Sequence, residues 1–493
     1  MAEDWLTDDE KQSKSEEQLL QLQRMESKLV AAAVNYPGVI TRRREHQLRY
    51  AINLARIETF QPGAARRGSR TSRPDVEVRT PRLTRLRNKL LRELRDPILD
   101  PKQGDQRLAN AAKILGPMIS DIEKTRAEIL EKYANEFSAL ALDQEVGKKT
   151  LVTIAGGGGG AGYVYIGAWA ELQRAGFVPG YVIGSSMGAL LGLFRAIRTR
   201  GEFGAYVELA KSMRDRSDEI FRYVSLNTRY GLPGVARLYL RSAIGAAFRK
   251  PDGEDMLLPD LEIPYEAVVA GVRTGALEET PDEYSRSHHL PVDKRPSTLQ
   301  LRARIGAQLV ALAGFINPRV VKEIVIGADE LTRDFNAVDA AGFSAAIPGI
   351  LHYDVARDDP HMSRILGELM ERESVSALVD GGVANNVPAR VAWQQVRKGK
   401  IGTRNGYFLA MDCFYPQYGL GHVWMQPVTR LLSYQVALNA RYAHRRLEMY
   451  PTLSPVNLLP NHAELDRAAE WGSSQIRTHL PYISRFLERV RWA

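Results

Sequence analysis

The 493-residue sequence contains a single cysteine, Cys413, so it cannot form an internal disulfide. Secreted domains that depend on disulfides are therefore excluded, and a reducing compartment is favoured. Long hydrophobic runs are also missing, because the longest nearly apolar stretch, residues 305–316, falls short of the roughly 20 residues that cross a bilayer. The first eighteen residues are acidic and polar, unlike a secretory signal. We expect a cytoplasmic protein, either in solution or peripheral to a membrane.

Acidic residues are scarce between residues 42 and 95, where sixteen Lys or Arg accompany five Asp or Glu. Such a basic block can attract anionic lipid headgroups or nucleic acid. Aromatic residues that could stack on bases are nearly absent from it, which argues against nucleic acid as a partner. Two interpretations stay open: peripheral contact with an anionic membrane, or an ordinary solvated helix face beside a basic loop.

The chain is longer than the roughly 250–300 residues at which one hydrophobic core stops growing, so at least two regions are expected. The first region reads as helical and partly basic, with a short basic helix over residues 82–95 that ends at Asp96-Pro97. Helical sequence is also expected near the end of the chain. The predicted divisions are residues 1–148, 149–460 and 461–493.

Alternating strands and helices begin after Lys149. A short apolar run, residues 151–155, leads directly into five consecutive glycines, and helical sequence follows from 163 to 175. A second strand is expected over residues 181–183, with another helix after it. The order strand, helix, strand, helix favours an α/β layer structure with a parallel sheet.

Residues 184–188, GSSMG, form a G-x-S-x-G pattern between the second strand and its helix. A serine at such a sharp turn stands clear of the backbone, and Gly184 and Gly188 lack the Cβ atoms that would clash. The following helix offers N–H groups and a positive dipole end to developing negative charge. Ser186 is therefore a candidate nucleophile, although a plain turn with a capping serine also fits the pattern taken alone.

The glycine run at residues 156–162, GGGGGAG, lets several backbone N–H groups point at one spot, as an oxyanion requires. A phosphate-binding P-loop would end in Gly-Lys-Ser or Gly-Lys-Thr, whereas Tyr163 follows here. A dinucleotide fingerprint is formally present at Gly157, Gly159 and Gly162, but no clear acidic residue closes a second strand about 20 residues later. A nucleotide-binding α/β protein is thus a weaker alternative to acyl transfer.

A third motif, residues 380–388 (DGGVANNVP), follows a short apolar run, although Asp-Gly alone is a common turn. Together the blocks resemble patatin-like phospholipases: residues 151–177 resemble the opening strand, loop and helix of that family, 184–192 its elbow, and 380–388 its catalytic-aspartate block. Residues 263–275 and 344–349 agree more weakly. The resemblance implies a three-layer α/β patatin-like fold with a mainly parallel central sheet, preceded by the helical N-terminal region.

The same resemblance implies a catalytic domain with a Ser186–Asp380 dyad, in which the aspartate takes the serine proton without a histidine. It implies that the substrate is a lipid or other acyl ester, with phospholipids and lysophospholipids as the first candidates. No metal and no cofactor are expected. The oxyanion would contact the N–H groups of Gly157, Gly158 and Gly159. Glycines expected to support the motifs are Gly162, Gly184, Gly188, Gly381 and Gly382.

Three features qualify this interpretation. Many relatives carry Arg or Lys in the glycine loop where this chain has Ala161, which leaves open a non-catalytic scaffold that binds a membrane or partner. His352 and His422 lie near the recognised blocks, and a histidine beside Ser186 would indicate a triad instead. Residues 278–340 exceed what a compact core needs, so we expect an insertion or lid there.

Overall fold

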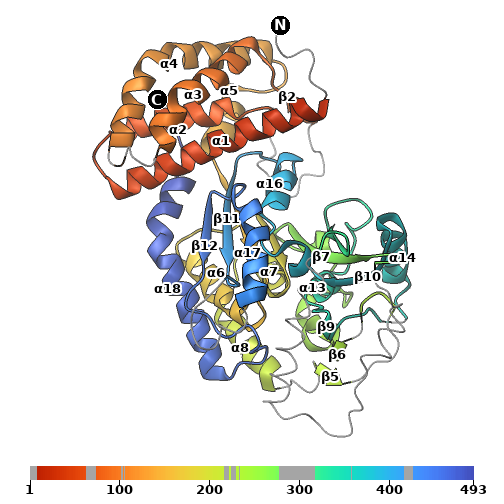
Figure 1. Cartoon of the computed structure of the whole chain (residues 1–493). Helices are drawn as coiled ribbons and strands as arrows, with labels where there is room; N and C mark the ends of the chain where they lie inside the picture. The colour runs from red at the N-terminus through yellow and green to blue at the C-terminus, as the bar shows by residue number, and fades with distance from the viewer. Residues whose placement is uncertain are drawn as a thin grey trace.

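A seven-stranded sheet forms the centre of the larger part of the molecule, as the computed structural model shows (Figure 1). Its strands are β3 (Thr150–Ala155), β4 (Tyr181–Ser185), β7 (Tyr265–Arg273), β8 (Val321–Ile326), β10 (Val375–Asp380), β11 (Gly406–Asp412) and β12 (Arg445–Glu448). The order is β10-β7-β4-β3-β11-β12, with β8 paired to β7. From β12 to β7 the strands run parallel, whereas β8 and β10 run antiparallel to β7. The mainly parallel α/β sheet predicted from the sequence is confirmed.

Three gaps of ten or more residues and several short ones separate the described parts of the chain. The structure describes residues 8–62, 74–100, 104, 106–201, 203–215, 221–223, 229–232, 234–276, 317–356, 358–415 and 426–492. Residues 305–316 and His422, both considered in the sequence, lie outside these parts. Of the expected insertion or lid at 278–340, the described portion begins at residue 317. There the chain forms β8 of the central sheet and then enters α13.

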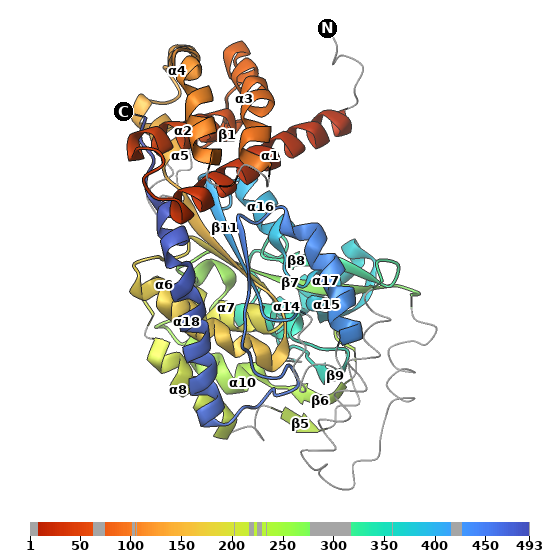
Figure 2. The same ribbon diagram turned by 60° about the vertical axis from the view of Figure 1, so that its left-hand side comes forward.

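Helices cover both faces of the sheet (Figure 2). The helices packed on its two faces are α6 (Val164–Arg174), α7 (Met187–Ile197), α13 (Ala337–Ser344) and α18 (His462–Leu487) on one, and α16 (Ala389–Arg397) and α17 (Gln426–Ala440) on the other. Along β3, Leu151 and Ala155 join the first core, whereas Val152 and Ile154 join the second. Because both faces are buried, the strand reads as a continuous apolar run rather than an alternating one.

Smaller elements complete this region beside the glycine loop and at the far end of the sheet. They are the 3₁₀ helix η2 (Gly159–Tyr163), α8 (Phe203–Asp215), α10 (Leu240–Ile244), α14 (Pro360–Glu373), α15 (Gly382–Asn385) and a small sheet of β5 (Phe221–Tyr223), β6 (Gly234–Leu238) and β9 (Gly349–His352).

Two strands, β4 and β10, pair with consecutive parts of one edge of β7. Val268 pairs with Ser185 of β4, and the next residue, Val269, pairs with Asp380 of β10. β8 pairs along the same residues of β7 and therefore occupies the opposite edge. Since β4 runs parallel to β7 and β10 runs antiparallel to it, the two strands point toward each other. Their carboxyl ends meet on neighbouring residues of β7.

The N-terminal region is a helical bundle with its own apolar core, confirming the predicted helical character (Figures 1 and 2). Its elements are α1 (Asp8–Asn35), α2 (Arg42–Ala55), α3 (Pro81–Leu99), α4 (Gln106–Lys132), α5 (Ala139–Gly147) and a short pairing of β1 (Thr59–Phe60) with β2 (Val76–Glu77). The predicted end of the basic helix at Asp96-Pro97 is wrong, because α3 continues through Pro97. Leu94 and Ile98 are fully buried in the bundle core, and this packing outweighs the hydrogen bond that proline cannot make.

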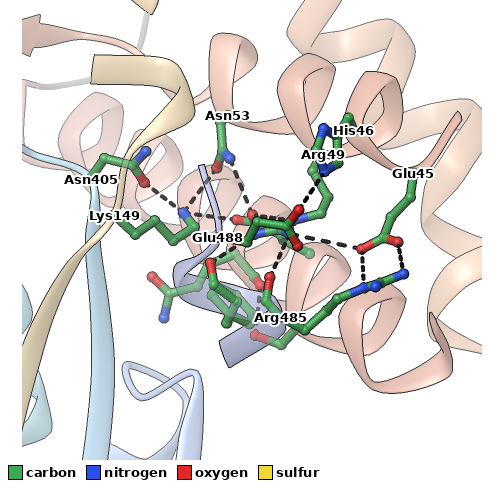
Figure 3. A network of polar contacts seen from close by, with 12 residues as sticks. Glu45, His46, Arg49, Asn53, Lys149, Asn405, Arg485 and Glu488 are labelled. Carbon is green, nitrogen blue, oxygen red and sulfur yellow. Dashed lines mark hydrogen bonds and ion pairs between the residues drawn. The ribbon is translucent and has the colours of Figure 1, made fainter. Parts of the chain in front are cut away.

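A buried polar network joins the bundle to the sheet (Figure 3). Glu26 of α1 accepts from Arg49 of α2 at 3.3 Å and lies 2.9 Å from the ammonium of Lys149, just before β3. The same ammonium contacts the side-chain oxygens of Asn53 at 3.1 Å and Asn405 at 2.5 Å. The two regions therefore share a desolvated, hydrogen-bonded interface rather than a solvated hinge.

Helix α18, formed by most of the predicted tail, packs along α6 and reaches the bundle. Gly167 of α6 lies so close to α18 that a Cβ there would overlap the carbonyl of Ala469. Near its other end, Arg485 donates to Glu45 of α2 at 3.0 Å. Among the described helices, none is both long and apolar enough to cross a bilayer. The described residues also contain no cluster of three or more His, Cys, Asp or Glu that could hold a metal.

Candidate active site

Ser186 occupies a strained turn between β4 and α7. Its φ is 53°, a left-handed value that is uncommon for a residue with a side chain, and the residue is 6% exposed. Its N–H donates to Ser344 Oγ at 2.9 Å, and its carbonyl accepts from Ala189 at 2.9 Å. Such strain persists where the surroundings hold it, and it occurs disproportionately at functional sites.

The glycines on either side of Ser186 permit close backbone packing, as predicted from the pattern. A Cβ on Gly184 would come within 2.5 Å of the Gly188 carbonyl carbon. A Cβ on Gly188 would overlap the carbonyl oxygen of Ala155 at the end of β3. Neither glycine lies in the left-handed region that favours glycine. The turn therefore excludes side chains through contact rather than through backbone conformation.

Asp380 ends β10 and is almost completely buried. Its Oδ1 accepts from the N–H of Gly382 at 2.7 Å, while Oδ2 has no hydrogen-bond partner within the described part of the chain. Burial raises the pKa of Asp380 to about 7, and the neighbouring Ser186 hydroxyl and the Gly382 N–H limit the rise because they favour the ionised form. A carboxyl group that ionises near neutral pH suits proton transfer.

Ser344 connects the Ser186 turn to the Asp380 turn. Its hydroxyl accepts from Ser186 N–H and donates to the Val268 carbonyl at 2.5 Å, and its own carbonyl accepts from Gly381 N–H at 3.1 Å. Sequence reasoning gave this residue no role. The available signal was its place as the serine of residues 344–349, the block that resembles the family's Ser-x-Ala-Ile-Pro segment.

The glycine loop lies directly against the nucleophile. A Cβ on Gly157 would come within 2.8 Å of the Ser186 Cβ, and Gly162 is similarly close to Met187. The Gly157 N–H already donates to the Asn386 carbonyl at 3.2 Å, so in this structure it is not free to bind an oxyanion. For Gly158 and Gly159, the described residues supply no acceptor to the backbone N–H.

Ala161, the position that departs from the family pattern, is fully buried in η2. Its N–H donates to the Gly158 carbonyl at 3.1 Å. This contact keeps the loop tightly turned after Gly159, whose φ is 52°. The loop therefore presents backbone groups to the site, with no cationic side chain at this position.

Buried polar atoms without partners gather at this site. They are Asp380 Oδ2, Asn386 Nδ2 and Ser185 Oγ, judged against the described residues. Buried polar groups are almost always hydrogen-bonded, so such a cluster indicates a place for substrate or water. Asn386 belongs to the 380–388 block but was not singled out from the sequence. Its N–H is held by Gln435 of α17 at 3.1 Å.

No described histidine takes part in the arrangement around Ser186 and Asp380. Nδ1 of His352 lies 2.9 Å from the Leu232 carbonyl, and burial lowers the pKa of that histidine. His352 therefore makes a structural contact at the end of β9. Among the described residues, no hydrogen bond links a histidine to Ser186 or Asp380 as a catalytic triad would require.

A small, mainly apolar pocket lies beside Ser186. Its lining residues include Leu190, Leu238, Leu351 and Leu458, and Arg214 contributes the charged group.

Comparison with known proteins gives one family. Residues 153–393, just under half of the chain, match the family model described as Patatin-like phospholipase. No curated protein matches the chain. The matched range contains the glycine loop, Ser186 and Asp380 and leaves the N-terminal bundle and α18 outside it. The family recognised from the motifs, together with its α/β fold class, is therefore confirmed.

Proposed function

Since residues 153–393 belong to the patatin-like phospholipase family, a family of lipid acyl hydrolases, we propose that this protein cleaves lipid carboxylic esters through a covalent acyl-enzyme on Ser186. Asp380 acts as its base. The observation that carries the proposal is the meeting of β4 and β10 on one edge of β7, with Ser185 and Asp380 on neighbouring rungs. This register brings a strained serine and a buried carboxyl to the same point.

The reaction follows from the chemistry of these two groups. Asp380 accepts the Ser186 hydroxyl proton as Oγ attacks the ester carbonyl carbon, which forms a tetrahedral intermediate. The intermediate expels the alcohol, which receives the proton from Asp380, and leaves an acyl group on Ser186. Water then attacks that acyl group with Asp380 again accepting a proton, and the fatty acid departs as Ser186 is reprotonated.

The oxyanion is assigned to the backbone N–H groups of Gly158 and Gly159, with Gly157 holding the loop through Asn386. Removing one preorganised donor in such a site typically costs about 100- to 1,000-fold in kcat. Because Ala161 supplies no positive charge, these backbone donors and the start of α7 carry the stabilisation.

The pocket beside Ser186 supports the lipid class that we propose. Leu190, Leu238 and Leu351 give it an apolar wall suited to an acyl chain, and Arg214 offers a cation to an anionic headgroup. Phospholipids and lysophospholipids combine both features. They are the substrates we propose to test first.

Peripheral membrane contact through residues 42–95 has weaker support. The described cations of this segment that form ion pairs are Arg42, Arg49, Arg56, Arg79, Arg87, Lys89, Arg92 and Arg95. Arg66 and Arg67 lie outside the described residues. Paired cations attract lipid headgroups less strongly, so a solvated face is the simpler interpretation. Co-sedimentation with anionic vesicles, compared with neutral vesicles, decides between the two.

The test of the hydrolase is the rate on p-nitrophenyl butyrate and on a phosphatidylcholine vesicle. Ser186→Ala is expected to lose at least about 1,000-fold, as other nucleophile deletions do. Ser27→Ala, on α1 in the bundle, is the matched control and should keep the parent rate. Equal rates in the parent and Ser186→Ala would reject the enzyme and favour the non-catalytic scaffold.

A further inference from the structure

Asn386 is fixed through its backbone, whereas its side-chain amide nitrogen lacks a partner. Its N–H donates to Gln435 Oε1 at 3.1 Å, and its carbonyl accepts from the Gly157 N–H at 3.2 Å. The residue is 2% exposed, yet its Nδ2 has no hydrogen-bond partner among the described residues. Buried polar groups are almost always hydrogen-bonded, so a fixed and unsatisfied donor indicates a group that it binds during the reaction.

The Asn386 carboxamide lies close to both the nucleophile and the base. The position that a Cβ of Gly157 would take is 2.8 Å from both Asn386 Oδ1 and Ser186 Cβ. The corresponding position on Gly382 is 3.1 Å from Asn386 Oδ1 and 2.9 Å from Asp380 Oδ1. The side chain is therefore in reach of a small molecule bound between the two reacting groups.

Asp380 offers the acceptor that matches this donor. Its Oδ2 is buried and has no hydrogen-bond partner in the part of the chain that the structure describes. Burial raises the pKa of Asp380, and the nearby Ser186 hydroxyl limits the rise. Once Ser186 carries an acyl group, that hydroxyl proton is gone and the carboxylate requires another donor. A water molecule can supply it, because water donates and accepts at the same time.

Ser185 adds a third polar group to the same place. Its Oγ is fully buried and has no hydrogen-bond partner among the residues described. It lies 2.8 Å from the position for a Cβ of Gly381, the residue after Asp380. Buried waters typically make about three hydrogen bonds to polar groups that otherwise lack partners. One donor, one acceptor and one hydroxyl therefore match a water molecule, whereas an oxyanion would require donors alone.

We propose that Asn386 and Asp380 together hold the water that releases the acyl group from Ser186, which makes Asn386 a catalytic residue of this second step. The water oxygen accepts from Asn386 Nδ2 through one lone pair, and one of its O–H groups donates to Asp380 Oδ2. Its second lone pair attacks the acyl carbonyl carbon while the O–H proton passes to Asp380. The bond to Ser186 Oγ then breaks, Oγ takes that proton, and the fatty acid leaves. This inference rests on the proposed function and deepens its second step.

Asn386→Leu tests the assignment, because leucine has nearly the shape of asparagine and donates no side-chain hydrogen bond. With p-nitrophenyl butyrate, the acyl-enzyme should form close to the parent rate, and its breakdown should slow about 100-fold. The burst of p-nitrophenol measures formation. The mass of the intact protein, followed after the substrate is removed, measures breakdown. Breakdown at the parent rate, or an equal loss in both steps, would overturn the proposal.

Asn385→Leu is the matched control from the same turn. The Asn385 side chain is already engaged, because it donates to Glu323 and accepts from Asn439. Its replacement disturbs the turn without removing the proposed donor, so the ratio of the two rates should match that of the parent. Accumulation of acyl-enzyme in both variants would make Asn386 a structural residue and reject the proposal. Asn386→Ala takes the place of Asn386→Leu if thermal unfolding shows that the leucine variant does not fold.

Hydroxylamine separates this proposal from the proposed reaction itself. It is a strong nucleophile that attacks an acyl-enzyme without a held water, so it should accelerate Asn386→Leu far more than the parent. Equal acceleration of the two would reject the water site and retain the acyl-enzyme on Ser186. If no protein carries an acyl group and Ser186→Ala hydrolyses at the parent rate, the proposed function fails and this inference fails with it.

Discussion

At the scale of single residues, burial of Asp380 has two opposed effects on its action as a base. Burial raises its pKa to about 7, which makes it a stronger base when ionised but leaves a fraction protonated at neutral pH. Its Oδ1 accepts from the Gly382 N–H, the neighbouring Ser186 hydroxyl also favours the ionised carboxylate, and Oδ2 has no hydrogen-bond partner among the described residues. A group tuned in this way should determine the pH dependence of the reaction.

We expect kcat/KM for a soluble ester to rise with pH through about 7 and then level off, because only ionised Asp380 can accept the Ser186 proton. Below that point the rate should fall about tenfold per pH unit. The measurement is an initial-rate profile with spontaneous hydrolysis subtracted. A profile that stays flat down to about pH 5 would assign the base to another group.

Asp380→Asn should be inactive and yet more stable than the parent at alkaline pH. The folded pKa of Asp380 lies above the unfolded value, so its ionisation destabilises the fold as pH rises through that interval. The gain should approach about 4 kcal/mol near pH 8 and shrink toward pH 4. Thermal unfolding at both pH values measures it, and a difference that does not change with pH would contradict this account.

At the scale of elements, the glycine-rich loop and the serine turn were predictable because each is local. The strand, the loop and the helix follow one another within residues 150–199, so their prediction depends only on residues close together in the sequence. The helix end at Asp96-Pro97 was predicted wrongly because burial of Ile98, a tertiary effect, decides it. The local sequence gives the intrinsic helix propensity of this segment, and tertiary packing of Ile98 outweighs that propensity.

The partnership of Ser186 with Asp380 could be predicted only through family resemblance. It depends on β4 and β10 sharing an edge of β7, which no local pattern encodes. The roles of Ser344 and Asn386 were not predicted, because their contacts are with residues far away in the sequence. The engagement of the Gly157 N–H by Asn386 could not be foreseen, because it requires the position of a distant carbonyl.

The crossing of α18 and α6 makes a prediction at this scale. A Cβ on Gly472 would overlap the carbonyl of Val164, so Gly472→Ala must push the helices apart and should cost about 1–3 kcal/mol. Gly367→Ala on α14 is the control, since nothing lies within 4 Å of its Cβ position, and it should stabilise by about 0.5–1 kcal/mol. Chemical denaturation measures both. Similar values for the two variants would contradict the close crossing.

At the scale of the whole molecule, the bundle is bound to the sheet through charge. Glu26 lies among Arg49, Arg56 and Lys149, and burial lowers the pKa of Lys149 to about 7 while Glu26 partly opposes the shift. Removing the carboxylate would leave three cations buried together. Such uncompensated charge is far more costly than the loss of a surface pair.

Glu26→Gln should therefore destabilise the protein by about 3–5 kcal/mol and expose the boundary before β3 to proteolysis. Glu17→Gln is the control, because Glu17 pairs with Arg441 at an exposed site and its loss should cost less than about 1 kcal/mol. Limited proteolysis and thermal unfolding report both. If the two variants behave alike, the network does not hold the bundle in place.

Because β4 and β10 meet end to end along one edge of β7, the backbone of β7 fixes the spacing of their carboxyl ends. Ser185, the residue before the proposed nucleophile, and Asp380, the proposed base, pair with residues of β7 that are one step apart, about 3.3 Å along the backbone, and the side chains of Val268 and Val269 do not set this spacing. The site should therefore tolerate aliphatic exchange in β7. A single-residue deletion within β10 would be different, because it turns Asp380 to the opposite face of the sheet. Such a protein would keep its fold and lose its activity. The register of β10 therefore matters more for activity than which aliphatic residues the strands contain.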